Sequence, residues 1–282
     1  MQTIEDTMYE VALDAAIAAS HHVMQYWPSP FNTSFDKEKV LQIFDKQEGV
    51  GNYATIADTE SEEIIIHRIK EHPELKDHGI LAEESENERV DAPYLWIIDP
   101  IDGTLNFRNG MTDFGISIGV AHNNEIIFGV IAMPALGQII VARQGRGVQI
   151  LSMDKNLLLD AKQLQIEQPF DKVMISYDLG YEDRRNQMVA SVEKFVDHVG
   201  YAPSYASASA SNYKIVTGSI GAYLHLTPTK YDVAAATCIL KELGGKVTDK
   251  DGNEIDWHAP TISYLGARDE KIHAELVELL KR

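Results

Sequence analysis

The sequence is poor in several features that would place a protein outside the cytoplasm or in a membrane. Cys238 is the single cysteine among 282 residues, which excludes an intrachain disulfide and favours a reducing compartment. No apolar run approaches the roughly 20 residues that a membrane-spanning helix needs. The segment from Met1 to Asp6 lacks the basic start and apolar stretch of a secretory signal. We therefore expect a cytoplasmic protein without a membrane partner.

Positive charge is also scarce. The chain has 25 lysines and arginines against 43 aspartates and glutamates, with a formal net charge of −18 and a pI near 4.9. This excess argues against nucleic acid as a partner, because an acidic surface and a phosphate backbone repel each other. It would also repel a small anionic substrate unless bound divalent cations reverse the local charge. The alternative is that the acidic residues only keep the protein soluble.

What is present is the composition of an ordinary globular protein, with 44% hydrophobic residues, in a chain long enough for one large domain or two half-sized ones. Apolar residues at helical spacing predict a helix over 5–26 that ends before Pro28. A capping-box pattern at Thr59-Glu60-Ser61-Glu62 predicts the start of a helix over 63–72. Two short buried strands are predicted, over 79–82 and 94–98.

The chain changes character after residue 114. Apolar stretches separated by turn residues predict an antiparallel meander over 115–142, and Gly145-Arg146-Gly147 predicts the turn that follows it. Beyond it, strands are predicted over 173–177 and 222–226, and helices over 184–198, 233–243 and 270–280. The change near residue 150 predicts an N-terminal α+β subdomain over 1–150 and a C-terminal α/β subdomain over 151–282.

Asp99 and Asp102 are the sharpest chemical signal. An apolar strand ends abruptly at Asp99, Pro100 stiffens the turn, and Asp102 follows in the same turn. Two carboxylates held close repel each other unless a proton or a cation lies between them, and hard oxygen donors favour Mg²⁺ or Ca²⁺. If a helix begins at Gly103-Thr104, its free N–H groups form an anion site beside the metal. The alternative is a strand-end turn in which the aspartates only cap.

Three other acidic residues are ambiguous when each is considered alone. Glu83 and Glu84 follow the predicted strand over 79–82, but adjacent glutamates in an acidic chain are usually solvated. Asp232 stands before an apolar helix, where an aspartate is a good N-cap. These residues therefore predict either parts of a metal site or ordinary surface and capping groups.

Considered together, these residues form motifs in a recognisable order. The motifs are Leu81-Ala82-Glu83-Glu84-Ser85, then Trp96 to Phe107, then Tyr231-Asp232-Val233-Ala234-Ala235-Ala236 and Glu242-Leu243-Gly244-Gly245. This order closely resembles the inositol monophosphatase family, within the lithium-sensitive, metal-dependent phosphatases, from the first helix through most of the chain. The resemblance implies an α/β (α+β) fold, a layered αβαβα sandwich of the sugar-phosphatase type. It also implies hydrolysis of a phosphomonoester.

The resemblance implies a role for each motif residue. Glu83 and Asp99 would bridge metals, Ile101 would lend its carbonyl, and Asp102 and Asp232 would hold the second metal, with roughly two or three Mg²⁺ per active site. Glu83, Thr104 and Asp102 would act in catalysis. Phosphate and substrate contacts would come from Asp102, Gly103, Thr104, Ser207, Ala208, His225 and Asp232. The expected partners are a small phosphorylated metabolite and a second copy of the chain in a homodimer.

Two positions depart from the family pattern. Asn52 stands where the family commonly has an aspartate that pairs with the metal-site threonine, and an amide cannot accept a proton as a carboxylate can. Direct proton relay through Thr104 would therefore lack its usual acceptor, and Glu83 or the acidity of the metal would have to suffice. His225 stands at the position of the glutamate that contacts the sugar in inositol phosphatases, so the substrate need not be an inositol phosphate. Relatives act on fructose bisphosphate, NADP or adenosine bisphosphate.

Other interpretations remain open at this stage. A glycoside hydrolase also uses two carboxylates, but it would work without a divalent metal. A catalytically impaired, protein-binding regulatory member would explain Asn52. Ser204 to Ser211 is rich in small residues and lacks a nucleophile-elbow pattern, so we expect close packing there instead of a catalytic serine.

Overall fold

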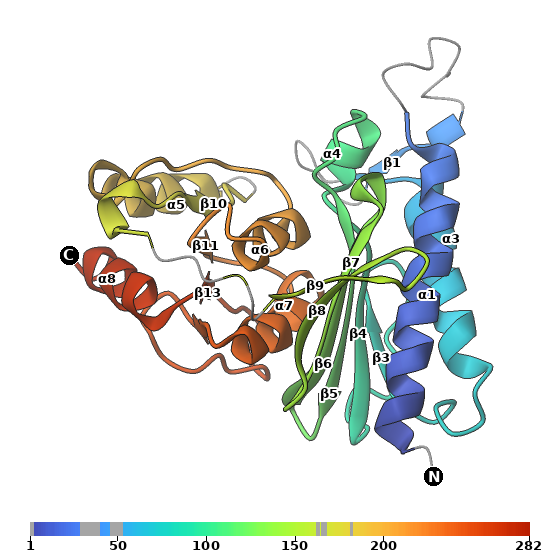
Figure 1. Ribbon diagram of the computed structural model, residues 1–282. Helices are drawn as coiled ribbons and strands as arrows, with labels where there is room; N and C mark the ends of the chain where they lie inside the picture. The colour runs from blue at the N-terminus through green and yellow to red at the C-terminus, as the bar shows by residue number, and fades with distance from the viewer. Residues whose placement is uncertain (1–2, 29–39, 46–52, 162–163, 165–167, 181–182) are drawn as a thin grey trace.

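The computed structural model describes the chain except for residues 1–2, 29–39, 46–52, 162–163, 165–167 and 181–182. Helices and sheets alternate in layers (Figure 1): α1 and α3, a large sheet, α6 and α7, a smaller sheet, and α5 with α8. Three buried hydrophobic clusters fill the spaces between successive layers. The predicted αβαβα sandwich is therefore confirmed.

The first sheet has 7 strands in chain order, with β3 parallel to β4 and all later neighbours antiparallel. Its strands are β3 (Gly79–Ala82), β4 (Tyr94–Asp102), β5 (Gly115–His122), β6 (Glu125–Met133), β7 (Gln138–Arg143), β8 (Gly147–Ser152) and β9 (Leu157–Asp160). Asn123 and Asn124 have φ angles of 49° and 69°, as a tight hairpin turn between β5 and β6 requires. The predicted meander is confirmed, and β8 and β9 extend it.

The helices on the outer face of this sheet are α1 (Ile4–Tyr26) and α3 (Ile56–Lys70). The helix predicted over 5–26 is confirmed. The predicted start of α3 is wrong, because the capping box that forms is Thr55 with Asp58, not Thr59 with Glu62. Glu62 instead turns inward, is 2% exposed and accepts a hydrogen bond from the Glu84 backbone nitrogen at 2.8 Å. The helix therefore begins at Ile56, about two turns before the predicted first residue Glu63.

The second sheet has 4 strands in the order β10, β11, β13, β12. Its strands and adjoining helices are β10 (Ile175–Tyr177), β11 (Ala222–His225), β12 (Lys246–Thr248), β13 (Tyr264–Ala267), α5 (Asp183–Glu193), α6 (Ala208–Val216), α7 (Lys230–Leu243) and α8 (Glu270–Leu280). The shorter elements are β1 (Phe44–Asp45), β2 (Tyr53–Ala54), α4 (Thr104–Arg108) and the 3₁₀ turns Pro134–Leu136, Phe170–Lys172 and Val196–His198. Sequence periodicity missed β13 and α6 and joined α5 to the 3₁₀ turn that follows it.

The division at residue 150 stays a prediction. The first sheet continues to Asp160 in β9, and α7 from the second half of the chain packs against both sheets. Within the part of the chain that the structure describes, no helix has the combination of length and apolar character that spanning a membrane requires.

Helix α7 lies very close to the first sheet because glycines face it. Gly119 and Gly129 pair across β5 and β6. A Cβ at Gly119 would lie 3.0 Å from the Ala234 Cβ, and one at Gly129 would lie 2.3 Å from the Ala235 carbonyl oxygen. The missing side chains therefore create the space in which α7, and with it Asp232, is seated.

An aromatic stack closes the end of the sheet where β4 begins. The indole N–H of buried Trp96 donates a hydrogen bond to His78 Nδ1, with 3.1 Å between the two nitrogens. The His78 ring stacks on Tyr94 at 4.9 Å between centroids, and Tyr94 stacks on His122 at 4.2 Å. Burial, with a smaller contribution from the positive charge of Arg89, holds the pKa of His78 below its ordinary value, against the opposing effect of Asp77.

A pH dependence of stability follows from this stack. Because the fold favours neutral His78, its contribution is fully present above the ordinary pKa of 6.5 and is lost as the pH falls below that value. We expect the free energy of unfolding to decrease between about pH 7 and pH 5.5. His78→Asn, whose amide oxygen can accept from Trp96, should weaken that dependence. Chemical denaturation followed by tryptophan fluorescence measures both, and parallel pH profiles of the two proteins would contradict the assignment.

Candidate metal centre

The end of β4 turns two aspartates toward the interior. Asp99 pairs with Ser117 and Asp102 with Gly115, and the register with β5 shifts between them. Such an irregularity re-aims side chains that a regular strand would place on alternate faces. Gly103 then adopts a left-handed conformation with φ of 84° and begins the short helix α4. The strand predicted over 94–98 is present but continues through Asp99 and Pro100 to Asp102, and the helix start that the sequence left conditional is present at Gly103-Thr104.

Three carboxylates converge at this turn. Asp99, Asp102 and Asp232 each offer an oxygen, and these oxygens lie within 4.8 Å of one another. Asp99 is 1% exposed and Asp102 is 8% exposed. Asp232 lies in the first turn of α7, where it accepts from the Thr229 backbone nitrogen at 2.7 Å, so Thr229 and not Asp232 is the N-cap residue. The same carboxylate therefore caps α7 and faces the other two.

The electrostatics of the cluster favour a proton or a cation between the carboxylates. Burial, reinforced by the charges of Glu83, Asp102 and Asp232, raises the pKa of Asp99 well above its ordinary value. Burial and the neighbouring carboxylates do the same to the pKa of Asp232. Burial raises the pKa of Asp102 to about 6, although hydrogen bonds from Ser207 and Ser209 oppose the shift. A set of oxygen donors with excess negative charge fits Mg²⁺ or Ca²⁺, and not a softer metal.

Glu83 approaches the cluster from the end of β3. It is half-buried, and its carboxyl group hydrogen-bonds the side chain of Asp99. Its charge also contributes to the raised pKa of Asp232. The neighbouring Glu84 is held through its backbone by Glu62 of α3. Of the two glutamates that sequence alone left ambiguous, Glu83 therefore borders the carboxylates, whereas Glu84 is held by its backbone against Glu62.

The side chain of Thr104 hydrogen-bonds a carboxylate, that of Asp58. Asn52 lies outside the described residues, but Thr104 Oγ1 lies 3.0 Å from Asp58 Oδ1 and 3.0 Å from the Ile101 carbonyl oxygen. Asp58 is fully buried and is itself fixed by the Thr55 backbone nitrogen and hydroxyl, at 2.7 and 2.6 Å. The expectation that proton relay through Thr104 lacks an acceptor is wrong. The Thr55-x-x-Asp58 pattern predicts the start of a helix, and only the tertiary structure connects Asp58 with Thr104.

The small-residue stretch lies directly against Asp102. Ser207 is the N-cap of α6, and its hydroxyl lies 2.5 Å from Asp102 Oδ2. The Ala208 backbone nitrogen lies 3.2 Å from Asp102 Oδ1, and that of Ser209 lies 2.5 Å from Oδ2. A Cβ at Gly103 would lie 2.9 Å from the Ser207 Cβ. Close packing was expected here, but the helix and its hydrogen bonds to Asp102 were not.

His225, the predicted substrate contact, lies on β11 and contributes no atom to the carboxylate cluster. It ends β11, is half-buried, and its Nδ1 lies 3.4 Å from the Tyr223 hydroxyl. Burial lowers the pKa of His225. The negative charge of Asp178 opposes this shift, and the positive charge of Arg184 adds to it. Tyr223 on the same strand has its pKa raised by burial and further by Asp178, Asp102 and Asp232. Tyr223, whose hydroxyl lies 3.4 Å from His225 Nδ1, is therefore within electrostatic reach of Asp102 and Asp232.

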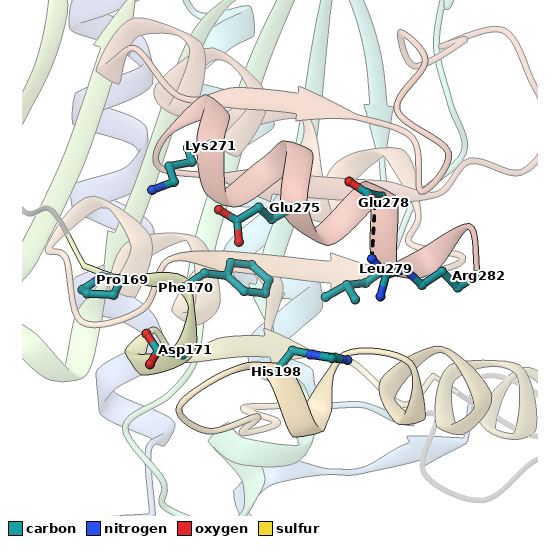
Figure 2. Close-up of a pocket in the computed structure, with 9 residues that line it drawn as sticks. All are labelled: Pro169, Phe170, Asp171, His198, Lys271, Glu275, Glu278, Leu279 and Arg282. Carbon is teal, nitrogen blue, oxygen red and sulfur yellow. Dashed lines mark hydrogen bonds and ion pairs between the residues drawn. The ribbon is translucent and has the colours of Figure 1, made fainter.

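A separate groove lies on the outer side of the second sheet (Figure 2). It has a volume of about 490 Å³, and Phe170 and Leu279 line it together with charged residues of α8 such as Lys271 and Glu275. None of the predicted site residues lines this groove, and it is separate from the carboxylate cluster.

Three carboxylates gathered at a strand end, within alternating layers of helix and sheet, form a site of the kind that can hold a hard divalent cation. The model of the inositol monophosphatase family matches residues 4–282, and the chain therefore belongs to that family. Its members depend on Mg²⁺.

Individual relatives agree with this assignment. The chain is 33% identical to the inositol-1-monophosphatase of Bacillus subtilis over 201 residues, covering 70% of this chain and 72% of the relative. It is 28% identical to the fructose-1,6-bisphosphatase/inositol-1-monophosphatase of Thermotoga maritima over 240 residues, covering 84% and 85%. The fold matches the extragenic suppressor protein SuhB of Bartonella henselae with a TM-score of 0.83 at 22% identity, covering 98% and 99% of the chains.

Proposed function

We propose that this protein hydrolyses the phosphomonoester of a small phosphorylated metabolite with Mg²⁺ held by Asp99, Asp102, Asp232 and Glu83. The observation that carries the proposal is the convergence of three carboxylate oxygens within 4.8 Å, directly beside the backbone turn that begins α4. Bound Mg²⁺, roughly two or three ions, supplies Lewis acidity and neutralises phosphoryl charge. The Ile101 carbonyl would complete the set of oxygen ligands.

The remaining groups would position the substrate. The backbone N–H groups of Gly103 and Thr104 would hold the phosphoryl oxygens at the start of α4. The Thr104 hydroxyl would orient the attacking water, and Asp58, hydrogen-bonded to that hydroxyl at 3.0 Å, would keep the hydroxyl in place and accept a proton. Ser207, Ala208 and His225 would border the leaving group. Water attacks phosphorus directly in this scheme, without a covalent phosphoenzyme.

The substrate is the open part of the proposal. The relatives' names specify an inositol phosphate and, for the Thermotoga maritima protein, fructose 1,6-bisphosphate as well. His225 offers a neutral ring where a carboxylate would contact a polyol, so a sugar phosphate, an adenosine bisphosphate or NADP belongs on the same list. We propose that the active protein is a homodimer in the cytoplasm. We also expect lithium to inhibit it.

The rival functions have less support. The impaired regulatory module rested on Asn52, yet Asp58 supplies a carboxylate to Thr104. A glycoside hydrolase needs a pair of carboxylates that flank a sugar bond, whereas here three carboxylates share one small volume.

Removal of metal is the direct test. We expect phosphate release from at least one member of a panel of inositol, sugar, nucleotide and dinucleotide phosphates in the presence of Mg²⁺. The activity should disappear with a chelator and return with excess Mg²⁺, because the clustered carboxylates need a cation to hold a phosphoryl group. Turnover that is unchanged by the chelator would favour the glycoside hydrolase. The absence of phosphate release from every substrate in the panel would favour the regulatory module.

A further inference from the structure

The first turn of α6 contacts both oxygens of Asp102. Ser207 Oγ and Ser209 N donate to Oδ2, each at 2.5 Å, and Ala208 N donates to Oδ1 at 3.2 Å. A carboxylate offers about four acceptor sites, two on each oxygen. Among the contacts that the described residues make, two donors therefore fill Oδ2, and a single acceptor site remains on Oδ1.

The Ser207 hydroxyl is oriented by its second contact. Its oxygen accepts a hydrogen bond from the Ala210 backbone nitrogen at 3.0 Å, as an N-cap side chain does. A hydroxyl carries one proton, and with the oxygen thus engaged that proton points to Asp102 Oδ2. Ser207 is 2% exposed, and its Cβ packs on Gly103, where there is no room for a side chain. Its position relative to Asp102 is therefore set from two sides.

This arrangement decides how Asp102 can bind a cation. Ca²⁺ accepts both oxygens of a carboxylate and tolerates irregular coordination by roughly six to eight ligands. Mg²⁺ demands near-ideal octahedral geometry, usually takes one oxygen from each carboxylate and keeps several waters. With Oδ2 filled, Asp102 can offer only Oδ1, which suits Mg²⁺ and withholds the second oxygen from Ca²⁺.

We propose that Ser207 is a positioning residue that keeps Asp102 a one-oxygen ligand and thereby favours Mg²⁺ over Ca²⁺ at this site. The proposal rests on the proposed function, because it assumes that Asp102 holds a metal. It adds the determinant of cation choice, which lies in the hydroxyl that caps α6 and not in the carboxylates themselves. Deleting that hydroxyl opens a second acceptor site, on Oδ2, and loosens the orientation of the carboxylate.

The experiment measures cation binding without turnover. Metal-depleted wild type, Ser207→Ala and Ser207→Gly are titrated calorimetrically with MgCl₂ and separately with CaCl₂. We expect the Mg²⁺ dissociation constant to rise about tenfold in both variants, as is typical when the support of a metal ligand is removed. The Ca²⁺ constant should change by less than about threefold, because the freed oxygen compensates. Glycine is a tolerated N-cap, so Ser207→Gly keeps the test decisive if Ser207→Ala is unstable.

Ser211→Ala is the matched control. Its hydroxyl belongs to the same helix and donates to the Ser207 carbonyl oxygen at 2.9 Å, away from Asp102. It should leave the ratio of the two dissociation constants at the wild-type value. Equal changes for Mg²⁺ and Ca²⁺ in the Ser207 variants overturn the inference about Ser207 and leave the phosphatase proposal standing. Failure of the wild type to bind either cation overturns both.

Discussion

Asp102→Asn is expected to lower turnover by at least about 100-fold, more than is typical when a group that only supports a metal ligand is removed. The amide is neutral and weaker as a ligand, so the cluster loses part of the charge that attracts Mg²⁺. The variant should still fold, since replacing a buried charge with a neutral group offsets the weaker hydrogen bonding to α6. Steady-state phosphate release and circular dichroism measure the two effects.

The same change at Asp91, an exposed carboxylate, provides the control for Asp102→Asn. Asp91→Asn should retain wild-type turnover. The wild type and this control should also gain thermal stability with added Mg²⁺, because a ligand that binds only the native state raises the melting temperature. Asp102→Asn should lose most of that gain. Robust activity of Asp102→Asn would overturn the metal assignment.

Gly129→Ala is expected to reduce stability and activity together. The added Cβ would lie 2.3 Å from the Ala235 carbonyl oxygen, a backbone atom of α7 that no side-chain rotation can move. Overpacking of this kind costs about 1–3 kcal/mol in the free energy of unfolding. Relief requires α7 to shift, and α7 carries Asp232 into the carboxylate cluster. We therefore also expect kcat to decrease by about tenfold, because small misplacements of catalytic groups are costly.

Gly137→Ala separates the two effects in that experiment. No atom lies within 4 Å of a Cβ at Gly137, and its φ of 65° makes the substitution cost about 1–2 kcal/mol through backbone strain alone. The two variants should therefore lose similar stability in denaturant unfolding. Only Gly129→Ala should weaken the response to Mg²⁺. A Gly129→Ala protein with wild-type stability would show that α7 is not seated as closely as the glycines indicate.

Local patterns predicted the parts of the fold that depend on near neighbours in the chain. The helix over 5–26 and the meander were identifiable because apolar periodicity reflects which face of an element is buried. The start of α3 was misplaced because two capping patterns lie within one turn of each other, and only burial of Glu62 decides between them. Helix α6 was missed because serine and alanine carry no helical hydrophobic period, and its start depends on the Ser207 cap.

The candidate metal site likewise has a part that local sequence predicted and a part that depended on tertiary packing. The Asp99-Pro100-Ile101-Asp102-Gly103-Thr104 segment was recognisable in sequence because its residue types and spacing are local features, although the strand runs through Pro100 to Asp102 before α4 begins. Sequence order could only suggest that Asp232 joins it, and the seating of α7 against Gly119 and Gly129 brings that carboxylate within reach.

The partners of the site residues came from the tertiary structure alone. The hydrogen bond from Thr104 to Asp58 and the bonds from α6 to Asp102 join segments far apart in the chain, where no spacing rule applies. Short motifs in the sequence were sufficient to suggest a hard-metal site, and their order along the chain carried the resemblance that implied the class of reaction. Only the packed layers decided which groups support each ligand, because that depends on how close separate elements can approach.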